Sequence, residues 1–310
     1  MKIIEQNDLT AGFPQPAVRR MLITGANGTL GRAFQRICAI RGIEVIALSR
    51  AELNISDPVS VESALSRYNP WAVVNTAGYV QVDEAEKDFE RCYRENTIGP
   101  AILAATCAYR DTHFLTFSSD MVFDGNKSVA YVESDVPCPL NVYGNSKRLA
   151  EREVLACMPK ALVVRTSAFF SAWDEYNFVY HTLRAGHNKQ AFEAADDVLI
   201  SPTYVPDLVN TSLDLLIDEE CGVWHLANQG AYTWADLAKL AADMASLDTS
   251  FVIPRSMRAL GLPAARPIYS VLGSTQGVLL PSSEERLHGC VSEVITVMRN
   301  ASEELMAVAS

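Results

Sequence analysis

The most constraining feature of this sequence is a glycine-rich segment at residues 21–34, which reads MLITGANGTLGRAF. A short apolar run is followed at once by Gly25, Gly28 and Gly31, and then by residues that favour a helix. Glycine permits a tight turn and lets backbone N–H groups approach a phosphate, while a helix that begins there adds partial positive charge. This order of strand, turn and helix predicts a dinucleotide-binding site rather than an ordinary glycine-rich turn.

The chain up to residue 166 alternates between two kinds of segment. Short apolar runs rich in β-forming residues predict strands at Met21–Thr24, Glu44–Leu48, Trp71–Asn75, Phe114–Phe117 and Leu162–Arg165. Apolar residues at helical spacing predict helices at Leu30–Ile40, Pro58–Tyr68, Phe89–Tyr109 and Ser146–Ala156. Repeated strand–helix–strand units predict an α/β fold, namely a doubly wound parallel (Rossmann) sheet with helices on both faces.

The alternation becomes looser after residue 166, where irregular pieces and prolines follow. We expect residues 167–204 and 229–310 to form a smaller C-terminal substrate-binding lobe. Within this lobe, Trp234–Leu247 has apolar residues at helical spacing, which indicates core packing more often than a ligand site.

The dinucleotide-binding domain is expected to comprise residues 21–166 together with residues 205–228. The second stretch contains a predicted helix at Asp207–Ile217 and a predicted strand at Gly222–Ala227, which return to the main sheet. Residues 1–20 lack clear periodicity and are predicted to be an N-terminal extension.

Charge and composition exclude several classes of function. The 310 residues carry a net charge of −11 without a basic run, so we expect no nucleic-acid partner. No apolar run approaches the ~18 residues of a membrane span, and the N-terminus lacks the apolar core of a signal peptide. The seven cysteines are odd in number and form no Cys-x-x-Cys pair, which favours a cytoplasmic protein over a disulfide framework.

A Tyr-x-x-x-Lys pair supplies the candidate acid–base chemistry. Tyr143 and Lys147 lie four residues apart and would project from the same face of a helix. A phenol has a pKa of about 10, and an adjacent ammonium favours the phenolate and brings that pKa towards the working range. Lys147 can also hold the nicotinamide ribose. Because the chain has 11 tyrosines, this pair alone could equally be a surface pair on a helix.

A third candidate stands at the end of the strand Phe114–Phe117, which is followed by Ser118, Ser119 and Asp120. The carboxyl ends of parallel strands line the ligand crevice of a doubly wound sheet. Ser119 would there hold a substrate carbonyl beside Tyr143, or it is only a cap or turn serine. We take Ser119, Tyr143 and Lys147 as the catalytic set.

The form of the cofactor depends on the end of the second strand, Ala47-Leu48-Ser49-Arg50. This stretch lacks the carboxylate that usually holds the ribose 2′-hydroxyl of NAD. Arg50 and Arg32 can instead pair with a 2′-phosphate, unless they are solvated surface arginines. We therefore prefer NADP(H) and keep NAD(H) as the alternative. The expected cofactor contacts are Gly25, Asn27, Gly28, Thr29, Leu30, Gly31, Arg50, Asn54, Ala77, Gly78, Tyr143 and Lys147.

The glycine-rich turn, the Ser118–Asp120 stretch at a strand end and the Tyr-x-x-x-Lys pair follow one another along the chain. Their order and spacing resemble those of the extended short-chain dehydrogenase/reductase family. Shorter strings make residues 21–275 similar to its dTDP-4-dehydrorhamnose reductase branch. These strings are Val82–Glu86, Glu95–Asn96, Val122–Gly125, Pro139–Gly144, Arg165–Ser167, Ser201–Tyr204 and Arg266–Pro267.

The resemblance implies NADPH-dependent reduction of a nucleotide-activated 4-keto-6-deoxy sugar, as in dTDP-rhamnose biosynthesis. It implies that Ser119 and Tyr143 hydrogen-bond the carbonyl oxygen, that Tyr143 donates the proton, and that Lys147 steadies the phenolate. Asn96 would organise the catalytic helix. The implied substrate contacts are Val80, Asp120, Met121, Ala168, Asn177 and Arg266.

Several positions depart from that branch. Met121 and Ala168 stand where the reductases usually have Tyr and Trp, so we expect an enlarged or reshaped sugar pocket. Val80 and Asn54 replace a common Thr and Asp. Ala33 occupies the acidic position that some members use for a metal, so no metal is expected.

Two alternatives stay open, and both keep the dinucleotide site. The first is a nucleotide-sugar epimerase of the same superfamily; dehydration is disfavoured because Met121, and not an acidic residue, follows Asp120. The second is a non-catalytic regulatory subunit. The five histidines show no metal-ligand spacing, and His225 is expected to be a strand residue with a satisfied ring. The sugar, the nucleotide and the oligomeric state are not determined, and we allow for a homodimer.

Overall fold

The computed structural model describes residues 20–278 and 280–309, with side chains described up to residue 300. Apart from Arg20, the predicted N-terminal extension lies outside the described residues. The centre of the molecule is a sheet of six strands in the order β10-β5-β4-β3-β1-β2, and every neighbouring pair is parallel. The strands are β1 (Met21–Thr24), β2 (Val45–Leu48), β3 (Ala72–Asn75), β4 (His113–Ser119), β5 (Leu162–Thr166) and β10 (Gly222–His225).

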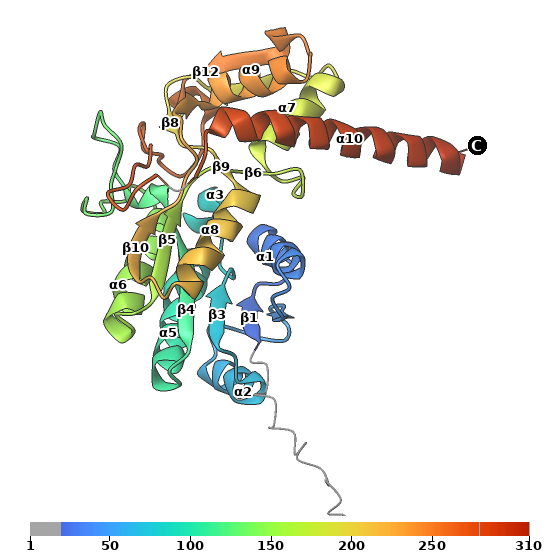
Figure 1. Ribbon diagram of the computed structural model, residues 1–310. Coiled ribbons are helices and arrows are strands. Elements are labelled where there is room, and N and C mark those ends of the chain that lie inside the picture. Colours follow the sequence, from blue (N-terminus) through green and yellow to red (C-terminus); the bar gives the residue numbers. More distant parts are fainter. Residues whose placement is uncertain (1–19, 279, 310) are drawn as a thin grey trace, which may run out of the picture.

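Helices cover both faces of this sheet (Figure 1). One face carries α1 (Thr29–Ile40) and α8 (Val205–Ile217), and the other carries α2 (Pro58–Tyr68), α5 (Gly99–Tyr109) and α6 (Val142–Cys157). The doubly wound fold predicted from the sequence is therefore confirmed.

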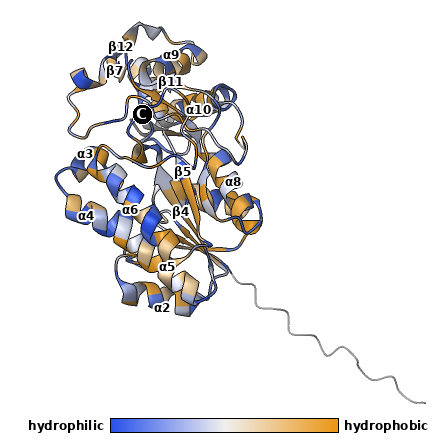
Figure 2. Cartoon of the chain, turned by 90° about the vertical axis from the view of Figure 1, so that its left-hand side faces the viewer, coloured by the Kyte–Doolittle hydropathy of each residue, from blue (hydrophilic) through white to orange (hydrophobic). Residues whose placement is uncertain are grey.

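Strand β1 shows why the strands read as continuous apolar runs. Met21 and Ile23 point into the core under α1 and α8, whereas Leu22 points into the core under α2 and α5. Successive side chains of a strand face opposite sides, so a sheet covered on both faces needs apolar residues at every position. The hydropathy colouring shows the same arrangement, with hydrophobic β4 and β5 enclosed by helices (Figure 2).

The predicted helix Phe89–Tyr109 is helical throughout, but it has three parts. It consists of α4 (Phe89–Tyr93), a π-helical segment η1 (Arg94–Ile98) and α5. A π segment adds a residue to one turn and is often found at functional sites. Helix α6, which carries Tyr143 and Lys147, begins at Val142, four residues earlier than predicted, and the short helix α3 (Val82–Ala85) was not predicted.

The C-terminal lobe is more regular than expected. Its elements enclose a core of their own, which includes Phe170, Leu183, Leu237 and Val291. The description of residues 167–204 and 229–310 as irregular pieces was wrong, although the exact domain boundaries stay a prediction. The elements are β6 (Phe169–Phe170), α7 (Phe178–His187), β7 (Phe192–Ala195), β8 (Leu199–Ile200), β9 (Thr203–Tyr204), β11 (Tyr232–Thr233), α9 (Trp234–Met244), η3 (Thr249–Phe251), β12 (Val252–Arg255), η4 (Met257–Leu260) and α10 (Ser283–Ala309).

The strands of this lobe are short and pair in twos, as β6–β9, β7–β12 and β8–β11. The lobe lies beyond the carboxyl ends of the main strands, and α10 extends away from the body (Figure 1). None of the helices in residues 20–278 and 280–309 combines the length and hydropathy that a bilayer span requires.

Candidate active site

A cavity of about 1140 Å³ lies between the carboxyl ends of the main strands and the C-terminal lobe. This volume exceeds the roughly 300–1,000 Å³ of a pocket for one drug-sized ligand, so the cavity has room for a dinucleotide and a second ligand. The predicted site residues in its wall are Gly25, Asn27, Gly28, Thr29, Leu30, Arg50, Asn54, Ala77, Gly78, Val80, Ser119, Asp120, Met121, Tyr143, Ala168 and Arg266.

The turn between β1 and α1 has the properties of a phosphate cradle. Gly28 is the N-cap of α1, and within the described residues no side chain caps this helix. Its first N–H groups are therefore left for an anion, where the helix dipole also favours negative charge. Gly31 lies behind the wall, and a Cβ at this position would stand 2.2 Å from the carbonyl oxygen of Gly25. Only glycine lets the helix pack so closely on the turn, and the cradle fits a pyrophosphate.

The end of β2 carries an arginine that already has a partner. Arg50 donates a 2.5 Å hydrogen bond to Glu95 Oε1, and Arg91 donates to the same oxygen at 2.7 Å. The Arg50 side chain is 60% exposed and that of Glu95 is 11% exposed. Glu95 therefore holds Arg50 at the cavity edge, where Arg32 also lines the wall. The sequence did not reveal this contact, because the two residues are far apart along the chain.

Ser119 stands at the end of β4 and has two roles. Its Oγ accepts a 3.2 Å hydrogen bond from the Met121 N–H and so caps the short 3₁₀ helix η2 (Asp120–Val122). The same hydroxyl lines the cavity and lies close enough to Tyr143 to act on the pKa of the phenol. The cap interpretation and the site interpretation of Ser119 are therefore compatible.

Helix α6 brings Tyr143 and Lys147 to this point. A Cβ on Gly144 would lie 2.1 Å from the carbonyl oxygen of Met121, so only glycine allows α6 to pack on the turn after β4. Lys147 Nζ donates to the Phe117 carbonyl at 3.2 Å and lies 5.8 Å from the centre of the Tyr143 ring. The phenol, the ammonium and the Ser119 hydroxyl thus lie in one cluster, and their catalytic roles stay a prediction.

The charge states of this cluster differ from expectation. Burial raises the pKa of Tyr143, the negative charge of Asp120 adds to the rise, and the nearby Ser119 hydroxyl offsets only part of it. The prediction that Lys147 brings the pKa of Tyr143 down towards the working range was therefore wrong. Burial lowers the pKa of Lys147 to about 8, with Cys92 and Glu151 acting in the opposite direction.

Asn96 ties the π segment η1 to the catalytic helix. Its amide nitrogen donates to the Tyr79 carbonyl at 2.9 Å and to Ser146 Oγ at 3.0 Å, and its amide oxygen accepts from the Tyr79 N–H at 2.7 Å. Ser146 in turn donates to the Tyr143 carbonyl at 2.7 Å. Asn96 is therefore placed to organise α6 beside the cavity, as the resemblance implied.

Asp120 is buried, and three serine hydroxyls donate to its carboxyl group. Oδ1 accepts from Ser119 at 3.0 Å, and Oδ2 accepts from Ser167 at 2.8 Å and Ser270 at 2.6 Å. Burial raises the pKa of Asp120, while the three hydroxyls act to lower it. Asp120 therefore links the end of β4, the residue after β5 and Ser270 of the C-terminal lobe at the cavity wall.

Two residues that were predicted to contact the substrate, Asn177 and Arg266, already have partners within the protein. Asn177 does not belong to the cavity wall: its Oδ1 caps α7 at the Tyr180 N–H, and its amide nitrogen donates to the carbonyls of Ser171 and Asp174. We correct its assignment to a structural one. Arg266 does line the cavity, but its guanidinium forms a two-pronged ion pair with Asp83, with hydrogen bonds of 2.5 and 2.6 Å.

The lobe side of the cavity contains residues that were not predicted as site residues. Several of them are aromatic, and no motif marks these because they come from separate loops and helices. They are Trp173, Tyr176, Phe178 and Trp234, with His181 and Glu193 as polar neighbours.

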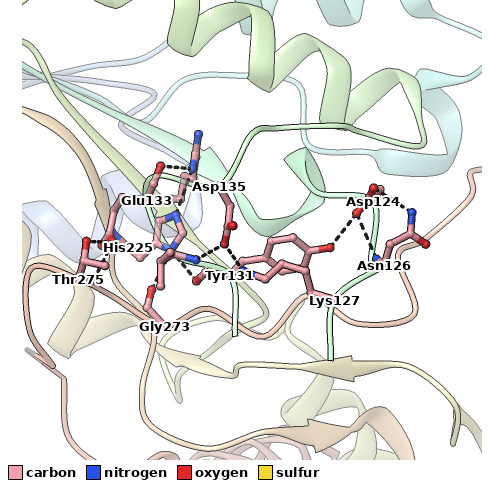
Figure 3. Close-up of polar contacts among 11 residues, drawn as sticks. Asp124, Asn126, Lys127, Tyr131, Glu133, Asp135, His225, Gly273 and Thr275 are labelled. Carbon is pink, nitrogen blue, oxygen red and sulfur yellow. Dashed lines mark hydrogen bonds and ion pairs between the residues drawn. The ribbon is translucent and has the colours of Figure 1, made fainter. Parts of the chain in front are cut away.

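His225 closes a separate polar cluster beside the sheet (Figure 3). Its Nδ1 lies 2.9 Å from the Gly273 carbonyl and 3.2 Å from the Tyr131 carbonyl, and its Nε2 lies 3.2 Å from the Arg165 guanidinium. Nδ1 therefore carries the proton and Nε2 accepts. Burial and the Arg165 charge lower the pKa of His225, which confirms the expected satisfied ring.

Glu133 belongs to the same polar cluster as His225 (Figure 3). Although burial acts to raise its pKa, hydrogen bonds from Ser274 and Thr275 lower it to about 2. Within the described part of the chain, no group of three or more His, Cys, Asp or Glu residues is arranged to hold a metal ion.

Together, the parallel sheet, the glycine cradle and the Ser119–Tyr143–Lys147 cluster define an extended short-chain dehydrogenase/reductase. The family model described as the RmlD substrate binding domain matches residues 19–291. The chain belongs to this family.

Individual relatives agree with this assignment. A dTDP-4-dehydrorhamnose reductase from Mycolicibacterium smegmatis is 35% identical over 286 residues, which cover 89% of this chain and 86% of that protein. A spore coat polysaccharide biosynthesis protein from Bacillus subtilis is 32% identical over 253 residues, 82% of this chain and 88% of its own. The crystal structure of dTDP-4-dehydrorhamnose reductase from Bacillus anthracis in complex with NADP superposes with a TM-score of 0.85 at 31% identity, covering 89% of this chain and 99% of that one.

Proposed function

We propose that this protein is an NADPH-dependent reductase of a nucleotide-activated 4-keto-6-deoxy sugar. The observation that carries the proposal is the position of Ser119 and Tyr143 in the wall of the cavity that also contains the phosphate cradle, with Lys147 Nζ 5.8 Å from the centre of the Tyr143 ring. Relatives named dTDP-4-dehydrorhamnose reductase and a neighbour bound to NADP support the substrate class and the cofactor.

The residues around the cradle are suited to the parts of NADPH. The uncapped N–H groups at the start of α1 would hold its pyrophosphate, Arg50 and Arg32 would hold its 2′-phosphate, and Lys147, behind Tyr143, would hold its nicotinamide ribose. When bound, NADPH supplies the hydride for the carbonyl carbon. NAD(H) is the alternative that the assay below includes.

The protein's own groups handle the carbonyl oxygen. Ser119 and Tyr143 hydrogen-bond this oxygen, and Tyr143 donates its proton to it as the alcohol forms. The raised pKa of Tyr143 keeps the phenol protonated until then. The Lys147 ammonium stabilises the phenolate that remains, and Asn96 holds α6 in place through Ser146. We place this reaction in the cytoplasm; a homodimer stays a prediction.

The function is tested with the full chain, NADPH or NADH, and a panel of nucleotide-linked 4-keto-6-deoxy sugars. We expect loss of NADPH absorbance that depends on the sugar and yields the alcohol. Interconversion of sugars without net NADPH oxidation would support an epimerase instead. Tight NADPH binding without turnover of any sugar would support the regulatory subunit.

We expect kcat/KM for the sugar to fall as the pH rises through about 8, the lowered pKa of Lys147. Above this pH the lysine loses the charge that stabilises the phenolate, whereas the raised pKa of Tyr143 keeps the phenol protonated. The pH dependence of kcat/KM for the sugar reports groups of the enzyme before the sugar binds, so it is the quantity to measure.

Lys147→Arg is the control for this assignment. A guanidinium stays charged across the range, so the residual activity of this variant should fall only at higher pH. The same alkaline limb in both proteins would contradict the assignment to Lys147.

A further inference from the structure

The loop between β6 and α7 reaches across to the phosphate cradle (Figure 1). We call residues 171–177 the strap. Thr29 Oγ1, on the first residue of α1, donates a 2.7 Å hydrogen bond to Asp174 Oδ2 of the strap. The two residues are 145 positions apart in the sequence, and both line the cavity. This bond joins the cofactor side of the cavity to its lobe side.

The strap is anchored on both sides of Asp174. Trp173 packs against the core under α1, and the Arg36 guanidinium lies 4.5 Å from the centre of its ring. Asn177 donates to the carbonyls of Ser171, at 2.8 Å, and of Asp174. The second carboxylate oxygen of Asp174 accepts a 3.0 Å hydrogen bond from the Tyr176 N–H. The carboxylate is therefore held near Thr29 at little further entropic cost.

The position of this carboxylate coincides with the place where the helix attracts negative charge. Gly28 offers no capping side chain, so Asp174 is the anionic group at the positive end of α1. The proposed function places the pyrophosphate of the cofactor at the same end. Rotation of the Asp174 side chain can break its bond to Thr29, but the anchored strap keeps the charge close by. Two like charges in a partly buried cleft then repel each other.

We infer that Asp174 sets the affinity of the dinucleotide site by competing with the cofactor pyrophosphate for the N-terminal end of α1. The inference rests on the proposed function. Its consequence is that the site binds reduced and oxidised cofactor less tightly than the cradle alone allows, which speeds release of the oxidised form.

The test compares Asp174→Asn with the unchanged protein by calorimetric titration of the full chain with NADPH. Asparagine keeps an acceptor for Thr29 and removes the charge. We expect the Kd to fall about 3- to 10-fold at low ionic strength, and the same for ADP-ribose, which carries the pyrophosphate without the nicotinamide. The difference should shrink in about 0.5 M salt, because salt screens the repulsion.

Glu175→Gln is the matched control, because it removes one carboxylate from an exposed position of the same strap. Its Kd should stay within about 2-fold of the unchanged protein. Asp174→Ser serves as a second neutral variant if thermal melting shows that Asp174→Asn is poorly folded.

Equal or weaker NADPH binding by the folded neutral variants would overturn the inference, and so would an equal gain in Glu175→Gln. Failure of the dinucleotide site on which the inference rests gives a different result, since neither NADPH nor ADP-ribose would then bind the unchanged protein or its variants. Failure of the sugar reductase activity alone would instead show as NADPH binding without turnover of any sugar, and would leave the effect of Asp174→Asn on the Kd measurable.

Discussion

Replacing Tyr143 with Phe is expected to lower kcat for sugar reduction about 100- to 10,000-fold, the usual contribution of a positioned acid. Phenylalanine keeps the ring that packs against the cluster around Tyr79 and Cys92, and removes only the hydroxyl beside Ser119. The carbonyl oxygen then loses its proton donor. The Kd for NADPH should change less than about 2-fold, because the glycine cradle and Lys147 are untouched.

Steady-state kinetics and calorimetric titration check this prediction together. Tyr68→Phe, which makes the same chemical change on a partly buried residue of α2 outside the cavity wall, should leave both quantities unchanged. If Tyr143→Phe kept more than about a tenth of the activity, Tyr143 would not be the proton donor.

Replacing Arg165 with Met is expected to lower the free energy of unfolding by about 3–5 kcal/mol, the usual cost of breaking a buried ion pair. Arg165 and Glu151 have side chains only 3% and 7% exposed, and their two hydrogen bonds measure 2.7 and 2.8 Å. The substitution leaves the Glu151 carboxylate buried, with the Ser118 hydroxyl as its remaining donor at 2.5 Å. It also removes the group that donates to His225.

Urea denaturation of three variants distinguishes the effect of breaking the buried ion pair from the effect of losing an arginine side chain. Arg152→Met breaks an exposed pair with Glu153 on the same helix α6 and should cost less than about 1 kcal/mol. The double variant Arg165→Met with Glu151→Gln should recover part of the loss, because no charge is left buried without a partner. Equal losses in Arg165→Met and Arg152→Met would refute the argument.

The sequence predicted the main sheet well because each of its strands carries its own signal. The first three residues of β1, Met21 to Ile23, are all apolar because both faces of the strand are covered, and the glycines after the strand mark the turn. The strands of the C-terminal lobe could not be predicted in this way. Its strands, such as β6 (Phe169–Phe170) and β9 (Thr203–Tyr204), are two residues long, and their pairing is fixed by distant partners instead of local periodicity. The π segment η1 was not predicted either, because one extra residue in a helical turn hardly changes the spacing of the apolar residues.

The sequence by itself determined which reactive groups the site contains and on which local elements they stand: Tyr143 and Lys147 one helical turn apart, Ser119 at a strand end, and glycines at a turn. Only the tertiary structure decided the state and the partners of these groups. Burial in the folded protein raises the pKa of Tyr143, Asn177 caps helix α7, and Asp174 accepts a hydrogen bond from Thr29. The physical reason is that spacing along a helix or strand is set by local backbone geometry. Desolvation and Coulomb energy instead depend on neighbours in space that the chain order does not reveal.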